Sequence, residues 1–126
     1  MKRILALILM LTMAVFCFAS CASIEKYEDK LDDADYEVEE VKVKELKSAL
    51  KDLKLDIDDY KVKEIIEAMG DEGEYVMVIK CGIFKSGKLV EDLQKAFKKN
   101  DIDRKVEKKG AYVFVGTKKG IKAATK

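Results

Sequence analysis

An uncharged apolar run at the start of the chain sets how much sequence is left to fold. Ile4 to Phe16 contain no charged residue, and Lys2 and Arg3 precede them. A positive start followed by a short apolar core is typical of a secretory signal, which the mature protein loses. Roughly 100 of the 126 residues then remain, enough for one compact domain. A retained signal anchor is an alternative, because counting on to Ala22 brings the run to the ~20 residues that span a bilayer.

The end of this segment carries a short motif. Phe18-Ala19-Ser20-Cys21 places a bulky apolar residue and two small residues before a cysteine. This arrangement resembles the lipobox of bacterial lipoproteins and departs from it only at Phe18, where Leu is usual. The resemblance implies cleavage between Ser20 and Cys21 and a diacylglyceryl group on the Cys21 sulfur. Two acyl chains anchor a protein stably, whereas one binds a bilayer only marginally.

The resemblance therefore predicts a signal peptide over residues 1–20 and a single extracytoplasmic domain over residues 21–126. The domain would be tethered through Cys21 to the outer side of the cell membrane. An ordinary secretory signal with a chance cysteine, giving a secreted protein, is the alternative.

The composition limits the chemistry that this domain can perform. The chain has no His, so it lacks the usual general base and the commonest zinc ligand. Once Cys17 is removed and Cys21 carries lipid, Cys81 remains as the one thiol, and no intramolecular disulfide can form. Cys81 follows a strand-like run, where we expect a buried thiol. We predict no catalytic residue, no metal and no cofactor.

The charges are unevenly distributed along the chain. Residues 21–75 hold 19 acidic and 9 basic side chains, whereas residues 76–126 hold 5 acidic and 14 basic ones. The two halves could lie against each other and compensate in the fold, which is the interpretation we favour. Alternatively, the basic half faces an anionic surface such as phospholipid headgroups or wall polymers. Because Arg104 is the sole Arg beyond the signal, lysines would provide diffuse attraction.

Hydrophobic periodicity predicts the order αβαββαββα. The helices are expected at about 24–34, 43–55, 89–100 and from Thr117 through Ala124, and the strands at about 36–41, 60–69, 75–81, 104–109 and 111–115. Residues 60–69 also fit a helix, but a strand gives the next strand a neighbour across a hairpin loop at 70–73. In that strand Tyr60, Val62, Ile66 and Ala68 would share one face.

The middle of this order, βαββαβ, is the ferredoxin-like arrangement. We therefore predict an α+β fold with an antiparallel sheet, helices packed on one face and extra terminal helices. The charged strand at 104–109 suits a sheet edge, where lysines discourage aggregation. The mature chain also resembles small uncharacterised lipoproteins of low-G+C Gram-positive bacteria in its acidic first half and its ending at residues 109–118. That resemblance implies location and fold only.

Three motifs resemble ligand-binding sequences, but each has a simpler interpretation. The loop from Gly82 to Leu89 fits G-x-x-x-x-G-K, yet Leu89 replaces the Ser or Thr that binds Mg²⁺. The segment from Gly116 to Gly120 could hold an anion, but we expect a capped helix start. The acidic clusters at 29–35 and 56–59 lack the calcium-loop pattern and are expected to be solvated.

These observations predict a non-catalytic binding or accessory module at the interface between membrane and cell wall. The expected partner is an anionic wall polymer or a protein that contacts the basic half. The lysine-rich stretch from Lys95 to Lys109 lacks interleaved aromatics, so we expect no nucleic acid, and we expect no nucleotide. A small envelope enzyme that uses carboxylate, Lys or Tyr acid–base groups is the alternative, and it requires a pocket with at least two titratable groups.

Overall fold

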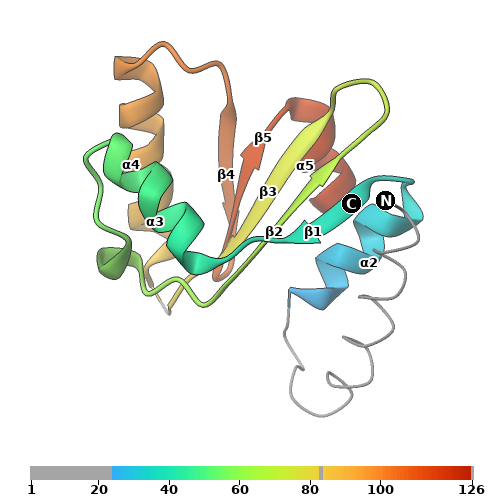
Figure 1. The fold of residues 1–126 in the computed structure, drawn as a ribbon, viewed down its shortest axis with the longest axis horizontal. Coiled ribbons are helices and arrows are strands. Elements are labelled where there is room, and N and C mark those ends of the chain that lie inside the picture. The colour runs from blue at the N-terminus through green and yellow to red at the C-terminus, as the bar shows by residue number, and fades with distance from the viewer. Residues whose placement is uncertain (1–23, 83, 126) are drawn as a thin grey trace.

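The computed structural model describes residues 24–82 and 84–125. The helices are α2 (Glu25–Asp33), α3 (Val43–Asp52), α4 (Ser86–Lys99) and α5 (Lys118–Thr125), with a short 3₁₀ helix, η1, at Ile57–Tyr60. The strands are β1 (Glu37–Glu40), β2 (Glu64–Met69), β3 (Tyr75–Lys80), β4 (Lys105–Lys109) and β5 (Tyr112–Gly116). The predicted element order is confirmed, with ends that shift by a few residues (Figure 1).

The five strands form one sheet in the order β1-β2-β3-β5-β4, and every neighbouring pair is antiparallel. The lysine-rich β4 lies at one edge, as its sequence predicts, and the acidic β1 lies at the other. β5 is an inner strand whose five residues are all buried, in agreement with its apolar sequence on both faces.

Helices cover both faces of the sheet, and Figure 1 shows α2 and α5 at one end of the molecule and α3 and α4 at the other. The core under α2 and α5 centres on Tyr27, whose ring meets Tyr112 and Phe114 edge-on at 4.8 and 5.1 Å. The core on the other face joins α3, η1 and α4 to the sheet. It consists of Leu46, Leu50, Ile57, Tyr60, Ile65, Ile79, Cys81, Leu89, Leu93, Val106, Val113 and Val115.

The predicted mixed fold with an antiparallel sheet is confirmed, but the ferredoxin-like details are not. In a ferredoxin-like sheet a third strand separates the two strands of each βαβ unit. Here β1 and β2 are direct neighbours although α3 connects them, and only the unit β3–α4–β4 is split, by β5. Periodicity fixes the order of elements along the chain and leaves their order in the sheet open. The middle helices α3 and α4 do share one face, while the terminal helices pack on the other.

Residues 60–69 form a strand only from Glu64 onward. Lys61 adopts a left-handed conformation at φ +50° and separates η1 from β2, which interrupts the alternation. Tyr60 therefore packs on the α3/α4 face, whereas Ile66 and Ala68 pack on the α2/α5 face. The expectation that these side chains share a face is wrong for this reason.

Candidate functional site

The predicted lipidation site Cys21 and the cleavage site after Ser20 lie outside the described residues. The described chain begins at Ile24, directly before α2. None of the helices within residues 24–82 and 84–125 has the length and apolar character needed to cross a bilayer.

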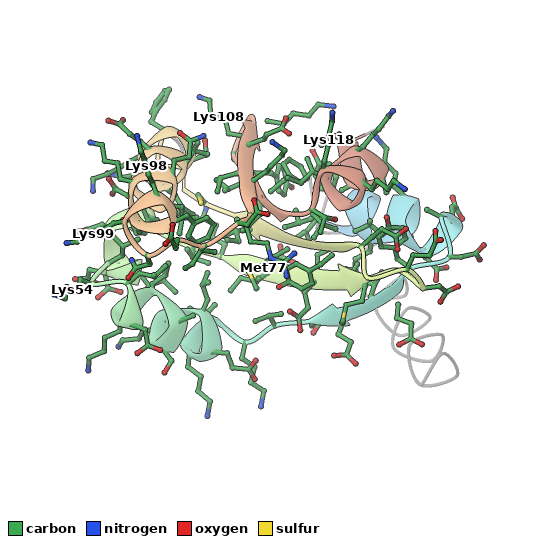
Figure 2. All side chains as sticks on the ribbon, turned by 90° about the horizontal axis from the view of Figure 1, so that it is seen from above. Lys54, Met77, Lys98, Lys99, Lys108 and Lys118 are labelled. Carbon is green, nitrogen blue, oxygen red and sulfur yellow. The ribbon has the colours of Figure 1, made fainter. Side chains whose placement is uncertain are left out.

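The lysines of the second half gather along one side of the fold. Figure 2 shows Lys98 of α4, Lys108 of β4 and Lys118 of α5 along one long edge of the molecule. We call the exposed lysines of these three elements the basic edge, leaving out Lys88, which pairs with Asp92. It comprises Lys95, Lys98, Lys99, Lys105, Lys108, Lys109, Lys118, Lys119 and Lys122.

The basic edge continues onto the end of α3. A cavity of about 350 Å³ lies between the C-terminal ends of α3 and α4 and is lined by Lys54, Lys95 and Lys99 together with Asp52 and Asp92. Figure 2 places Lys54 beside Lys99 at this end. Lys54 belongs to the half of the chain that is acidic overall, so the fold adds to the basic surface a residue that the charge count alone did not assign to it.

A hydrogen-bonded network holds α4 beside η1 under this surface. The Tyr60 hydroxyl donates to Asp92 Oδ2 at 2.7 Å, and Lys88 Nζ lies 3.2 Å from the same oxygen. Burial works against ionisation of Asp92, but the hydrogen bonds from Tyr60 and Lys88 outweigh it and lower the pKa of this carboxyl. The network therefore keeps Asp92 charged and fixes one wall of the cavity.

Ion pairs between side chains do little to neutralise the opposite net charges of the acidic first half and the basic second half of the chain. Between residues that the structure describes, one ion pair joins the halves, Lys80 with Glu64 at 3.9 Å. The acidic β1 and the lysine-rich β4 lie at opposite edges of the sheet, so their charges are separated in space. Arg104 contacts the fold instead, with its guanidinium 5.2 Å from the centre of the Tyr75 ring.

A second cavity lies beside the first helix, and its charge is of the opposite sign. It has a volume of about 330 Å³ and is enclosed by α2, the end of β1 and the start of β2. We call it the acidic pocket. Its lining consists of Ile24, Glu28, Glu40, Val41, Lys42, Val43, Lys63, Glu64, Ile65 and Ile66.

Glu28 is the unusual residue of the acidic pocket. Its side chain is only 3 % exposed, and it makes no hydrogen bond or ion pair with another described residue. Burial raises its pKa to about 7, and repulsion from Glu40 and from three further acidic neighbours adds to the shift. A buried carboxyl that is half ionised near neutral pH is typical of a functional position.

The sequence did not point to the acidic pocket. Glu28 lies on α2 between Tyr27 and Leu31, and Glu40 and Glu64 come from two later strands. Only the pairing of β1 with β2 brings these three carboxylates to one cavity. The one available signal was that Glu28 follows Tyr27 at the border of the helix face that packs on the sheet.

Cys81 occupies the buried position that the sequence predicts. Its side chain is 2 % exposed, and burial raises the pKa of the thiol to about 11. The thiol is therefore neutral at physiological pH and packs in the core between the sheet and α4.

The backbone of the phosphate-loop-like segment is engaged within the fold. The Gly82 N–H donates to the Tyr60 carbonyl at 3.2 Å, and the Lys85 N–H donates to the Gly82 carbonyl at 3.0 Å. The Ser86 hydroxyl donates to the Gly110 carbonyl at 2.6 Å. The lysine of the motif, Lys88, contacts Asp92 and the Tyr60 ring.

The two remaining motifs have structural roles. Thr117 Oγ1 accepts a hydrogen bond from the Gly120 N–H at 3.1 Å, which is the capped helix start that we expected. Asp56 accepts from the Asp58 N–H at 3.0 Å at the start of η1. Within the described ranges, no three acidic or cysteine side chains are grouped so that they could hold a metal ion.

Comparison with protein-family models, with curated proteins and with solved structures finds no match to this chain.

Proposed function

We propose that this chain is a lipid-anchored protein on the extracytoplasmic side of the cell membrane, with a signal peptide over residues 1–20 and lipid on Cys21. The support is the motif Phe18-Ala19-Ser20-Cys21. Cells fed an alkyne-tagged fatty acid should label the protein. A Cys21→Ser chain that still takes up the tag would contradict the proposal.

The anchored domain acts as a non-catalytic binding module whose ligand is an anionic polymer of the cell wall. The observation that carries this proposal is the basic edge, with its exposed lysines on α4, β4 and α5. Lysines attract an extended polyanion diffusely, without the bidentate geometry that Arg uses for a single phosphate. The split unit β3–α4–β4 is the part of the ferredoxin-like prediction that we retain, and it carries six of the nine lysines of the basic edge.

The position of the anchor favours a wall polymer over phospholipid headgroups. Three peptide links separate Cys21 from Ile24, a reach of at most about 11 Å, and Ile24 lines the acidic pocket beside β1. Within the basic edge, β4 lies across the sheet, roughly 19 Å from β1 at the usual strand spacing, whereas α5 packs against α2. The separation of β4 exceeds the ~8 Å screening length at physiological ionic strength, so the β4 lysines are screened from the charges of a membrane that lies against β1.

Binding to purified wall material tests this proposal. The full chain in a non-ionic detergent should pellet with the wall at low salt and remain in solution at high salt. Replacing Lys98, Lys105 and Lys108 by Gln should weaken binding about tenfold. The matched control replaces Lys26, Lys44 and Lys61, which are exposed elsewhere, and should leave binding unchanged. Equal losses in both variants, or preferential binding to anionic liposomes, would argue against the basic edge as the wall-binding surface.

A small envelope enzyme is a second candidate, and the acidic pocket favours it. Such an enzyme needs a cavity with at least two titratable groups, and Glu28, Glu64 and Lys63 line this one. A carboxyl with a pKa of about 7 can exchange protons with a substrate at neutral pH. The test measures the hydrolysis of model esters and glycosides. Hydrolysis that is lost in Glu28→Gln but kept in Asp33→Asn would support an enzymatic function, and equal rates in the two variants would exclude it.

A further inference from the structure

The acidic pocket brings together carboxylates from three separate elements. Glu28 of α2, Glu40 of β1 and Glu64 of β2 all line the same cavity. Each of the other two repels the ionised form of Glu28. With three glutamates against the two lysines of its lining, the cavity has an excess of negative charge, which favours an occupant of the opposite charge.

Glu28 itself has no partner among the described residues. Glu28 is 3 % exposed, and because no fully buried side-chain oxygen or nitrogen among the described residues lacks a hydrogen-bond partner, its carboxylate oxygens are the part of the side chain that solvent reaches. Lys42 and Lys63 also line the cavity, but both are exposed, and neither forms an ion pair with Glu28. This carboxylate lines a cavity of about 330 Å³.

The remaining walls of the pocket decide which class of cation fits. They are the apolar side chains of Ile24, Val41, Val43, Ile65 and Ile66. A bare metal ion needs several oxygen ligands converging on one point, and the described residues offer no such group. An organic cation uses both features, because its charged head can pair with a carboxylate while its hydrocarbon part contacts the apolar walls.

We propose that the acidic pocket binds an alkylammonium ion, with the ammonium group paired to Glu28 and the alkyl chain packed against Ile24, Val41 and Ile65. Glu40 and Glu64 add attraction from the cavity wall. This site is distinct from the basic edge, for which we propose a ligand of opposite charge.

Binding should depend on pH, because only ionised Glu28 pairs with an ammonium group. The charged side chains around Glu28 are Glu25 and Asp29 on α2, Glu40 on β1, Glu64 on β2, and Lys42 and Lys63 at the cavity rim. With a pKa of about 7, Glu28 is mostly neutral at pH 6 and mostly ionised at pH 8. An alkylamine stays charged across this range. The affinity should therefore be about tenfold higher at pH 8 than at pH 6.

The experiment titrates the ¹⁵N-labelled full chain with n-pentylammonium in a non-ionic detergent and follows the amide signals by NMR. Shifts should be confined to α2, the end of β1 and the start of β2, and n-pentanol should shift these signals far less. Glu28→Gln should weaken binding at least tenfold. Asp33→Asn removes the same charge from an exposed position at the end of α2 and should leave the affinity unchanged.

A second variant guards against an effect of Glu28→Gln on folding. Glu40→Gln changes an exposed residue and should weaken binding by a smaller factor while the spectrum stays native. The proposal is overturned if n-pentylammonium causes no shifts at these elements, if pentanol binds as well, or if affinity is the same at pH 6 and pH 8. It is also overturned if Glu28→Gln binds like the original chain, or if calcium ions displace the amine.

Discussion

Gly116 at the end of β5 and Gly120 in the first turn of α5 both lie directly against the backbone of β3. A Cβ atom at either position would meet the carbonyl oxygen of Tyr75, and at Gly116 it would also lie 2.8 Å from the Cα of Val76. Neither contact can relax by moving a side chain, because the opposing atoms belong to the main chain. These two residues therefore need glycine for space, even though their backbone angles are ordinary.

Gly116→Ala should lower the free energy of unfolding by about 3 kcal/mol or more, because the clash forces β5 and β3 apart. Gly87→Ala is the matched control. A Cβ there finds only Lys108 Nζ at 3.7 Å, and Ala favours the first turn of α4, so the change should be neutral or stabilise by up to about 1 kcal/mol. Urea denaturation measures the change in the free energy of unfolding for both variants. A small change in Gly116→Ala would mean that β5 and β3 are not packed this closely.

The reactivity of the Cys81 thiol reports on how well the core around this residue is closed to solvent. At pH 8 a thiol with a pKa of about 11 is roughly one-thousandth ionised, and only the thiolate reacts with alkylating agents. Iodoacetamide should therefore leave Cys81 unmodified in the native full chain and modify it completely in guanidinium chloride. Mass spectrometry of the peptide that contains Cys81 gives the readout. Rapid modification without denaturant would contradict the buried position.

Glu28 should make stability fall as the pH rises. Its pKa in the native protein, about 7, lies above the usual value of 4.5. Between these two pH values the native state binds more protons than the unfolded state, so the slope of unfolding free energy against pH is negative. The stabilisation is complete below about pH 4.5 and is lost above pH 7, where the cost reaches roughly 3 kcal/mol.

The Glu28→Gln variant isolates this effect, because all other carboxyl groups are shared with the original chain. The two proteins should have equal stability near pH 4.5, and the variant should be more stable by roughly 3 kcal/mol at pH 8. Asp33→Asn should show no such divergence. A constant difference across the pH range would mean that Glu28 keeps an ordinary pKa in the native protein.

At the scale of the elements, the Thr117 hydroxyl caps the first turn of α5 and adds to the backbone hydrogen bond that the Thr117 N–H donates to the Tyr75 carbonyl at 2.8 Å. Thr117 Oγ1 accepts from the Gly120 N–H and from the Tyr75 N–H, both at 3.1 Å, and lies 3.2 Å from the Tyr75 carbonyl. One side chain thus caps the helix and ties it to β3. Thr117→Ala should cost about 1–2 kcal/mol, whereas Thr117→Ser keeps the hydroxyl and should cost less than half of that. Thermal denaturation of the two variants provides the comparison, and equal losses would assign the stabilisation to the methyl group.

The elements also show what the sequence could and could not predict. α3 and α4 were predictable because Leu46, Leu50, Leu89 and Leu93 recur at helical spacing and are all buried. The order of strands in the sheet was not, because β1 pairs with β2 through contacts that periodicity does not encode. For the same reason the acidic pocket was missed, since it forms only once β1 and β2 are neighbours beneath α2. The left-handed Lys61 likewise gives no signal in a sequence pattern.

At the scale of the whole molecule, a net charge of +1 conceals two edges of opposite sign. β1 presents Glu37, Glu39 and Glu40 at one edge of the sheet, and β4 presents its lysines at the other. If the two halves compensated each other in the fold, a charged surface would encounter a nearly neutral molecule. With the β1 and β4 edges separated, an anionic surface is attracted by the β4 edge and a cationic surface by the β1 edge. The two attractions do not cancel, because the roughly 19 Å between the edges exceeds the ~10 Å screening length at 0.1 M salt.

The separated edges should make the full chain bind to both cation- and anion-exchange resins at pH 7 in a non-ionic detergent. Replacing Lys98, Lys105 and Lys108 by Gln should abolish retention on the cation exchanger and leave the anion exchanger unaffected, and replacing Glu37, Glu39 and Glu40 by Gln should do the reverse. The salt concentration at elution measures each effect. A chain whose charges compensate internally would pass through both resins, and its two variants would differ only by their net charge. Retention of the original chain on both resins therefore decides between the two interpretations of the charge distribution.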